Sequence, residues 1–169
     1  MSPPRLPRLI ATVFGTGYLR PAPGTWGSAV AVAAGVVLHG LGGFPLLAAA
    51  TLAVTALGFW ATARMVADLP DKDPSEIVID EVAGQWIALL APSAGFWMRG
   101  LDSWDFPWPG WLAAFVFFRL FDIWKPGPIG RADRRGTAAG TMIDDLWAGA
   151  FAAVATLVAA GLWHGVIAR

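Results

Sequence analysis

The segment EIVIDEVAGQW, residues 76–86, places two adjacent carboxylates, Asp80 and Glu81, at the start of an apolar run that continues to Met98. On a helix, residues four apart share a face, so Asp80 would lie beside Gly84 and Glu81 beside Gln85. A single acidic residue in a first turn would only complement the helix dipole. Two carboxylates beside a glycine favour a ligand site at the beginning of this helix.

Long apolar runs also occupy most of the chain on both sides of this segment. The 169 residues are 56% hydrophobic and 14% charged, whereas soluble domains are about 45–50% apolar and roughly 25% charged. A membrane span needs about 20 mostly apolar residues, and Gly42-Gly43-Phe44-Pro45 is a turn signal within the first run. We therefore predict one domain over residues 1–169, an all-α membrane bundle of about five helices. The predicted helices cover residues 28–41, 44–66, 77–97, 108–125 and 142–167.

The basic residues indicate the orientation of this bundle, because cytoplasmic loops of membrane proteins are enriched in Lys and Arg. If the N-terminus is cytoplasmic and every helix crosses, the outer segments hold only Arg99 and Arg169. The inner loops then hold Arg5, Arg8, Arg20, Arg64, Lys72, Lys125, Arg131, Arg134 and Arg135. The same orientation brings three polar segments, 15–28, 71–81 and 119–145, to the cytoplasmic ends of the helices.

The first polar segment contains PAPGTWGS, residues 21–28. Gly24 and Gly27 would let backbone amides approach a ligand, while Thr25 and Ser28 offer hydroxyl groups. Ser28 could cap the following helix, whose N-terminus favours an anion. The alternative interpretation is a plain loop with a helix cap.

A third motif, FFRLFDIWKP, residues 117–126, carries charged residues at every third position. Arg119, Asp122 and Lys125 therefore lie on one arc of a helix, which Pro126 ends. An intrahelical ladder of salt bridges would be the structural alternative, although such a ladder gains little and is costly to desolvate. The arc favours a site that combines a carboxylate with two cationic side chains.

A fourth motif, TMIDDLWAG, residues 141–149, repeats the pattern of EIVIDEVAGQW, because Asp144 and Asp145 follow an isoleucine at the start of an apolar run. Ionisable residues within membrane spans cost roughly 2.5–3.5 kcal/mol each and usually mark function. One or two divalent cations would relieve the repulsion among the clustered carboxylates. Oxygen ligands without Cys or His suit Mg²⁺ or Mn²⁺. The predicted metal ligands are Asp80, Glu81, Asp122, Asp144 and Asp145.

Composition also excludes several classes of function. The zero net charge argues against nucleic-acid binding, and the absence of cysteine excludes a thiol nucleophile. His39 and His164 lie in apolar runs, where structural or interfacial roles are expected, and there is no Walker A sequence for a nucleotide. The main alternative to an enzyme is an ion-coupled transporter or channel, because intramembrane carboxylates also mark ion pathways.

The motifs PAPGTWGS, EIVIDEVAGQW, FRLFDIWKPGPI and MIDDLWAG, in this order, resemble those of the phosphatidylglycerophosphatase A family, over about residues 12–155. The resemblance implies an all-helical, Mg²⁺-dependent enzyme of the bacterial inner membrane. Such an enzyme dephosphorylates the lipid phosphatidylglycerophosphate to phosphatidylglycerol. With the charge pattern, the resemblance predicts a multi-pass protein whose active site faces the cytoplasm.

The family resemblance and the charge pattern together suggest, as a hypothesis, roles for individual residues of the four motifs. The metal lowers the pKa of a bound water and holds phosphate oxygens, while Arg119 and Lys125 neutralise charge on the phosphoryl group. Asp80 and Asp122 complete the predicted catalytic set, and one unassigned carboxylate acts as general base. A covalent aspartyl-phosphate on Asp122 is the alternative. The predicted substrate-binding residues are Gly24, Thr25, Gly27, Ser28, Arg119 and Lys125. The oligomeric state stays undetermined by the sequence.

Overall fold

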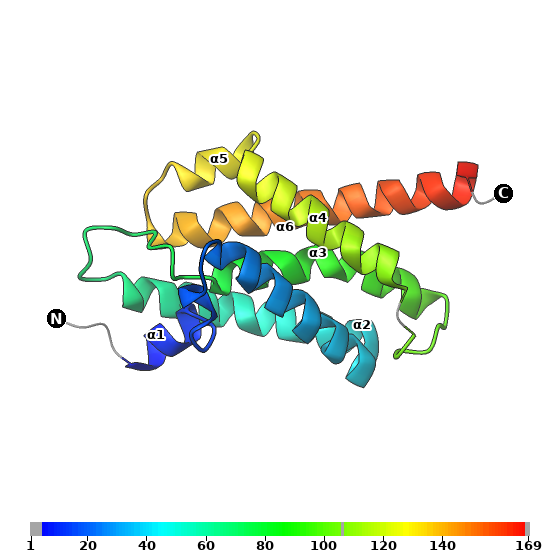
Figure 1. The fold of residues 1–169 in the computed structure, drawn as a ribbon, viewed down its shortest axis with the longest axis horizontal. Helices are drawn as coiled ribbons and strands as arrows, with labels where there is room; N and C mark the ends of the chain where they lie inside the picture. The colour runs from blue at the N-terminus through cyan, green and yellow to red at the C-terminus, as the bar shows by residue number, and fades with distance from the viewer. Residues whose placement is uncertain (1–4, 106, 168–169) are drawn as a thin grey trace.

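A computed structural model describes residues 5–105 and 107–167, and within these ranges the protein is helical without a strand (Figure 1). The prediction of an all-α fold is therefore confirmed. Arg169, which the charge pattern assigned to an outer segment, lies outside the described residues. In chain order the elements are α1 (Arg5–Ala11), the 3-10 helix η1 (Thr16–Tyr18), α2 (Pro23–Met65), α3 (Ile79–Met98), α4 (Trp108–Trp124), α5 (Pro128–Asp133), α6 (Ala138–Leu162) and η2 (Trp163–Ile167).

Helix α2 is a hairpin of two helical segments, 23–41 and 44–65, rather than one rod. Gly42 and Gly43 break the helical backbone, and Gly43 has a φ of 61°, a conformation that favours glycine. Figure 1 shows the chain turning back at this point, so that both ends of α2 lie near the same end of the bundle. The predicted helices 28–41 and 44–66 are confirmed as these two segments.

The first segment begins at Pro23, five residues earlier than expected. Proline suits the first turn of a helix because its missing N–H would have no partner there. The earlier start gives 19 residues and a length of about 28 Å at 1.5 Å per residue. That length approaches the roughly 30 Å hydrocarbon core of a bilayer.

Helix α3 forms the centre of the bundle and packs against α2 and α6. The Trp86 indole N–H donates to the Ala31 carbonyl at 2.7 Å, which ties α3 to the first segment of α2. Toward α6, Gly84 and Gly149 face each other so closely that a side chain on either would meet the backbone of the other helix. Small residues at such a crossing let two helix backbones approach. The crossing brings the first turns of α3 and α6 together.

The outer surface of the bundle is apolar over long stretches. Leu52 on α2 is 75% exposed and Val154 on α6 is 62% exposed. By length and composition, α2 and α6 could each cross a membrane. Helices with an apolar outer face suit a lipid environment, because in water such a face would favour association.

Candidate active site

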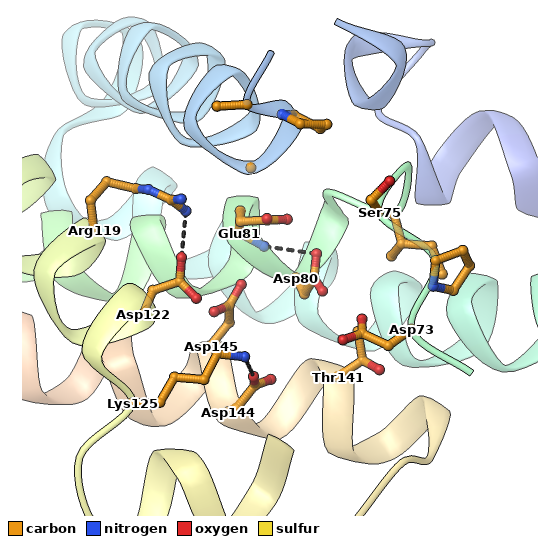
Figure 2. A pocket seen from close by; sticks show the side chains of 15 residues that line it. Asp73, Ser75, Asp80, Glu81, Arg119, Asp122, Lys125, Thr141, Asp144 and Asp145 are labelled. Carbon is orange, nitrogen blue, oxygen red and sulfur yellow. Dashed lines mark hydrogen bonds and ion pairs between the residues drawn. The ribbon is translucent and has the colours of Figure 1, made fainter. Parts of the chain in front are cut away.

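A polar pocket of about 340 Å³ lies at the end of the bundle where α2, α3 and α6 begin and α4 ends (Figure 2). The four predicted motifs meet here, so segments that are far apart in sequence contribute to a single cavity. The lining residues are Ala22, Pro23, Gly24, Asp73, Pro74, Ser75, Ile77, Asp80, Glu81, Arg119, Asp122, Lys125, Thr141, Asp144 and Asp145.

Three carboxylates form the tightest part of this cluster. Asp80 and Glu81 from the first turn of α3 and Asp145 from α6 each offer an oxygen, and these oxygens lie within 4.8 Å of one another. Asp80 is 6% exposed and Asp145 is 4% exposed, while the Oε2 atom of Glu81 is buried without a hydrogen-bond partner. Buried like charges at this spacing need a compensating cation, and oxygen donors suit a hard divalent ion.

Asp122 and Arg119 close the cluster from α4. An Arg119 Nη1 donates to Asp122 Oδ2 at 2.5 Å, and the same nitrogen lies 3.5 Å from Ser28 Oγ. Ser28 in turn donates to the carbonyl of Gly24 at 2.8 Å. The predicted arc is therefore present, and its first two members form an ion pair that faces the beginning of α2.

Lys125 does not continue this ladder. It is the C-cap of α4, in the left-handed conformation with a φ of 49°, and its ammonium group turns toward α6 and α5. It donates to Asp144 Oδ2 at 2.8 Å and also to Asp133. The ladder interpretation thus holds for Arg119 and Asp122 only, because the helix ends where Lys125 would have extended it.

The residues of the PAPGTWGS motif take separate places. Gly24 lies directly against Glu81 and Arg119, so that a side chain there would enter the pocket. Gly27 packs on the side chain of Val78, and Thr25 is exposed and does not line the pocket.

The expected capping role of Ser28 is wrong. The residue lies inside α2, whose N-cap is Ala22, because the helix begins at Pro23. Its hydroxyl bonds one turn back along its own helix and faces Arg119. Residues 23–28 of the motif therefore form the beginning of a helix rather than a loop.

The structure adds polar residues that the motifs did not single out. Asp73 and Ser75, from the connection between α2 and α3, line the pocket together with Thr141. Thr141 donates to the carbonyl of Lys72 at 3.2 Å, which fastens this connection to the first turn of α6. The positions of Asp73 and Ser75 depend on loop geometry, for which helical periodicity gives no signal.

The pKa of Asp73 is raised above its ordinary value. Desolvation of its carboxylate by the pocket wall is the main cause, although the residue as a whole is exposed, and Lys125 opposes the shift. The negative charges of Asp133 and Asp71 add to it. The Asp73 carboxylate is therefore partly desolvated where it lines the pocket.

The charge balance of the pocket indicates what it can bind. Six carboxylates line it, from Asp73, Asp80, Glu81, Asp122, Asp144 and Asp145, and its two cationic side chains already pair with carboxylates. A phosphate group could enter only with cations that offset this charge. Oxygen ligands for a divalent ion beside an Arg side chain form an arrangement typical of phosphoryl chemistry.

The two histidines lie apart from this pocket. His39 is buried and its Nδ1 lies 2.8 Å from Ser93 Oγ, in contact with the rings of Phe96 and Trp111. His164 follows α6 and is exposed. Neither lines the polar pocket.

Comparisons with known proteins agree on one family. The model of the family "Phosphatidylglycerophosphatase A" matches residues 9–160. A phosphatidylglycerophosphatase A of Haemophilus influenzae is 38% identical over 148 residues, 86% of this chain and 83% of the relative. The Escherichia coli protein of the same name is 33% identical, over 86% of this chain and 78% of the relative.

A third relative carries a different name. A putative phosphatidylinositol-3-phosphatase of Bacteroides thetaiotaomicron is 36% identical over 167 residues, 95% of this chain and 96% of the relative. No solved structure matches the chain.

Proposed function

The chain belongs to the phosphatidylglycerophosphatase A family, and from this premise we propose that it hydrolyses phosphatidylglycerophosphate to phosphatidylglycerol and inorganic phosphate with Mg²⁺ as cofactor. Family membership makes it a phosphatase that acts on a phospholipid in phosphatidylglycerol synthesis, and the two long apolar helices agree with a membrane protein. The observation that carries the proposal is the cluster of Asp80, Glu81 and Asp145 beside Arg119 in one pocket.

The residues present fit a magnesium site. Their donors are carboxylate oxygens from three helices, and buried oxygens of Glu81 and Asp144 have no partner within the protein. We assign the ligands to Asp80, Glu81, Asp122, Asp144 and Asp145. When bound, Mg²⁺ supplies Lewis-acid activation of the phosphate and of the attacking water, which otherwise is a weak nucleophile at neutral pH.

Side chains of the pocket would position the phosphoryl group and neutralise the negative charge that develops on it. Arg119 points from α4 toward the space beside Gly24, where it can donate to a phosphate oxygen as negative charge grows on the phosphoryl group. Gly24 leaves room for that group, and Ser28 holds the guanidinium from the side. Lys125 lies within reach of the same space, where it holds Asp144 in place and offers further positive charge.

The chemical step is a hydrolysis. Water oxygen forms a bond to phosphorus, the bond from phosphorus to the glycerol oxygen breaks, and that oxygen takes up a proton to leave as an alcohol. One carboxylate of the cluster accepts the proton of the water, with Asp80 and Asp122 as the two catalytic candidates. In the alternative route, Asp122 attacks phosphorus and the acyl phosphate is hydrolysed in a second step.

We also propose a multi-pass protein of the bacterial inner membrane whose pocket faces the cytoplasm. Helix α1, which carries Arg8, ends beside the start of α3, where the Val78 N–H donates to the Ala11 carbonyl. Lys72 lies at this same end, whereas Arg99 follows the opposite end of α3. Basic residues on the inner side support this orientation. It would place the site at the membrane surface, where a lipid headgroup can reach it.

The direct test is phosphate release by the purified protein in detergent from three lipids: phosphatidylglycerophosphate, phosphatidic acid and phosphatidylinositol 3-phosphate. We expect release from the first lipid only, and only with Mg²⁺. Release from phosphatidylinositol 3-phosphate alone would overturn the substrate assignment, while release in excess EDTA would overturn the cofactor. No release from any lipid by a folded protein would direct attention to ion transport.

Replacement of Asp122 by Asn should abolish turnover without unfolding the protein, because removing one of the six carboxylates that line the pocket reduces the repulsion among them. The matched control is Asp68→Asn, which makes the same change at an exposed residue that does not line the pocket. The control should keep full activity. Full activity of Asp122→Asn would exclude both the ligand role and the nucleophile role of Asp122.

A further inference from the structure

A second cavity, of about 370 Å³, lies between the first segment of α2 and α4. Its wall contains only apolar and aromatic residues: Ala29, Val32, Trp108, Trp111, Leu112 and Phe115. We refer to these six residues as the apolar groove. The polar chemistry described above uses none of them, so the groove needs a separate explanation.

The groove continues the polar pocket along the same two helices. On α2, Gly24 lines the pocket and Ser28 contacts Arg119, and Ala29 and Val32 follow directly in the groove. On α4, Phe115 lies one turn from Arg119 toward the opposite end of the bundle. The contact between Ser28 and Arg119 is therefore the boundary between a polar and an apolar compartment.

The length of the groove suits a hydrocarbon chain. From Arg119, α4 extends four residues to Phe115 and eleven to Trp108, which correspond to about 6 Å and about 17 Å at 1.5 Å per residue. Both helices therefore extend from the phosphate site toward the interior of a bilayer. A lipid whose phosphate lies beside Arg119 would bring its acyl region along this path.

The groove is open to the outside of the bundle. Leu112 is 49% exposed, while Trp111 forms a buried floor. An apolar cavity with an exposed edge is a binding site for an apolar ligand, because burial of apolar surface is favourable and no charged side chain lines the wall. If α4 lies in a bilayer, a lipid substrate could enter the apolar groove laterally and remain within the bilayer.

We infer that the apolar groove binds an acyl chain of the lipid substrate and so orients the headgroup toward Arg119 and the carboxylate cluster; this inference rests on the proposed function. The groove makes the enzyme sensitive to chain length, since a substrate with short chains cannot fill it. It also favours membrane-embedded lipids over soluble phosphomonoesters, which have no apolar part to bind there.

The kinetic test compares phosphatidylglycerophosphate with two oleoyl chains and with two hexanoyl chains. Leu112→Trp fills the groove from α4, and Ala29→Phe fills it from α2. For each variant we expect the ratio of kcat/KM for the long-chain substrate to that for the short-chain substrate to fall at least tenfold. The control is Ala53→Phe, an exposed position on the second segment of α2 outside the groove, for which the ratio should not change.

A binding test needs no variant of the groove. The Asp122→Asn protein is incubated with phosphatidylglycerophosphate that carries a photoreactive diazirine in one acyl chain, and labelled peptides are mapped by mass spectrometry. We expect labels on α2 residues 29–32 and α4 residues 108–115, reduced by excess unlabelled substrate but not by phosphatidylcholine.

The outcomes separate this inference from the proposed function. If the wild-type protein hydrolyses the lipid but both folded variants keep the wild-type chain-length ratio, the groove does not bind the substrate. Labels spread over the lipid-facing surface of α6 without competition would likewise overturn the inference and indicate bulk lipid. If the wild-type protein releases no phosphate from either chain length, the proposed function itself fails.

Discussion

The crossing of α3 and α6 at Gly84 and Gly149 offers the sharpest test of how the fold builds the site. A Cβ atom at Gly149 would lie 2.9 Å from the carbonyl carbon of Gly84 and 3.0 Å from Cβ of Ile87, and closer still to the Gly84 carbonyl oxygen. Carbon atoms in contact lie about 3.5–4.0 Å apart, so Gly149→Ala must separate the two helices by about 0.5–1 Å.

This separation reaches the carboxylates, because Asp80 lies one turn before Gly84 and Asp145 one turn before Gly149. Mg²⁺ demands near-ideal geometry, and a misplacement of about 1 Å can cost about 100-fold in rate. We expect kcat/KM to fall about 10- to 100-fold and the Mg²⁺ concentration for half-maximal activity to rise. Overpacking should also cost about 1–3 kcal/mol of stability.

The assay is Mg²⁺-titrated phosphate release, with thermal unfolding measured on the same preparation. Gly161→Ala is the matched control, since it makes the same change in α6 where a Cβ meets no atom within 4 Å. The control should keep wild-type activity and lose no stability. If Gly149→Ala folds and keeps wild-type activity and Mg²⁺ dependence, then the helix separation does not set the geometry of the site.

Three further predictions concern the charges of the pocket. Lys125→Met removes the partner of Asp144, so the free energy of unfolding, measured by chemical denaturation in EDTA, should fall by about 1–3 kcal/mol. In a double-mutant cycle, the addition of Asp144→Asn should restore part of that loss. Because the pKa of Asp73 is raised in the folded protein, ionisation of its carboxyl at neutral pH costs stability. Asp73→Asn removes this cost, so it should raise the thermal midpoint of unfolding at pH 7 in EDTA. That gain should disappear as the pH falls below the ordinary carboxyl pKa, and a gain independent of pH would contradict the reasoning. Mg²⁺ at 100 times its dissociation constant should stabilise the protein by about 2.7 kcal/mol, whereas a sodium salt at equal ionic strength should not, as differential scanning fluorimetry can measure.

The helices that cross the bundle could be predicted because each has a long apolar run with a strong terminal signal. The Gly42-Gly43 break separated the two segments of α2, and Pro126 marked the end of α4. The short helix α5 gave no such signal. Isolated helices of six residues are unstable, so α5 depends on the burial of residues such as Ile129 against the rest of the protein.

The start of α2 shows where composition misleads. PAPGTWGS has the proline and glycine content of a loop, yet most of it is helical. Its glycines are required by tertiary contacts, since Gly24 lies against Glu81 and Gly27 against Val78. Only the neighbouring helix explains why small residues occupy a helix there, and a single sequence does not contain that information.

The convergence of the carboxylates followed from the charge pattern, whereas their pairing did not. Placing the polar segments at one end of the helices predicted that Asp80, Glu81, Asp122, Asp144 and Asp145 would meet, and all five line one pocket. The spacing of Arg119, Asp122 and Lys125 suggested a common surface for both cations. Both cations line the pocket, but Lys125 pairs with Asp144 and Asp133 rather than with Asp122, because the left-handed backbone at the helix end redirects its side chain.

This pairing has a consequence for the order of binding. A phosphomonoester carries about −1.5 to −2 charges at pH 7, and the pocket already has six carboxylates against two cationic side chains that are engaged in ion pairs. Phosphate binding without metal would add repulsion to a site that is negative before the lipid arrives. Under the proposed function, the metal must therefore bind before the lipid or together with it. Arg119 can then exchange Asp122 for a phosphate oxygen once the cation has taken over the charge of that carboxylate.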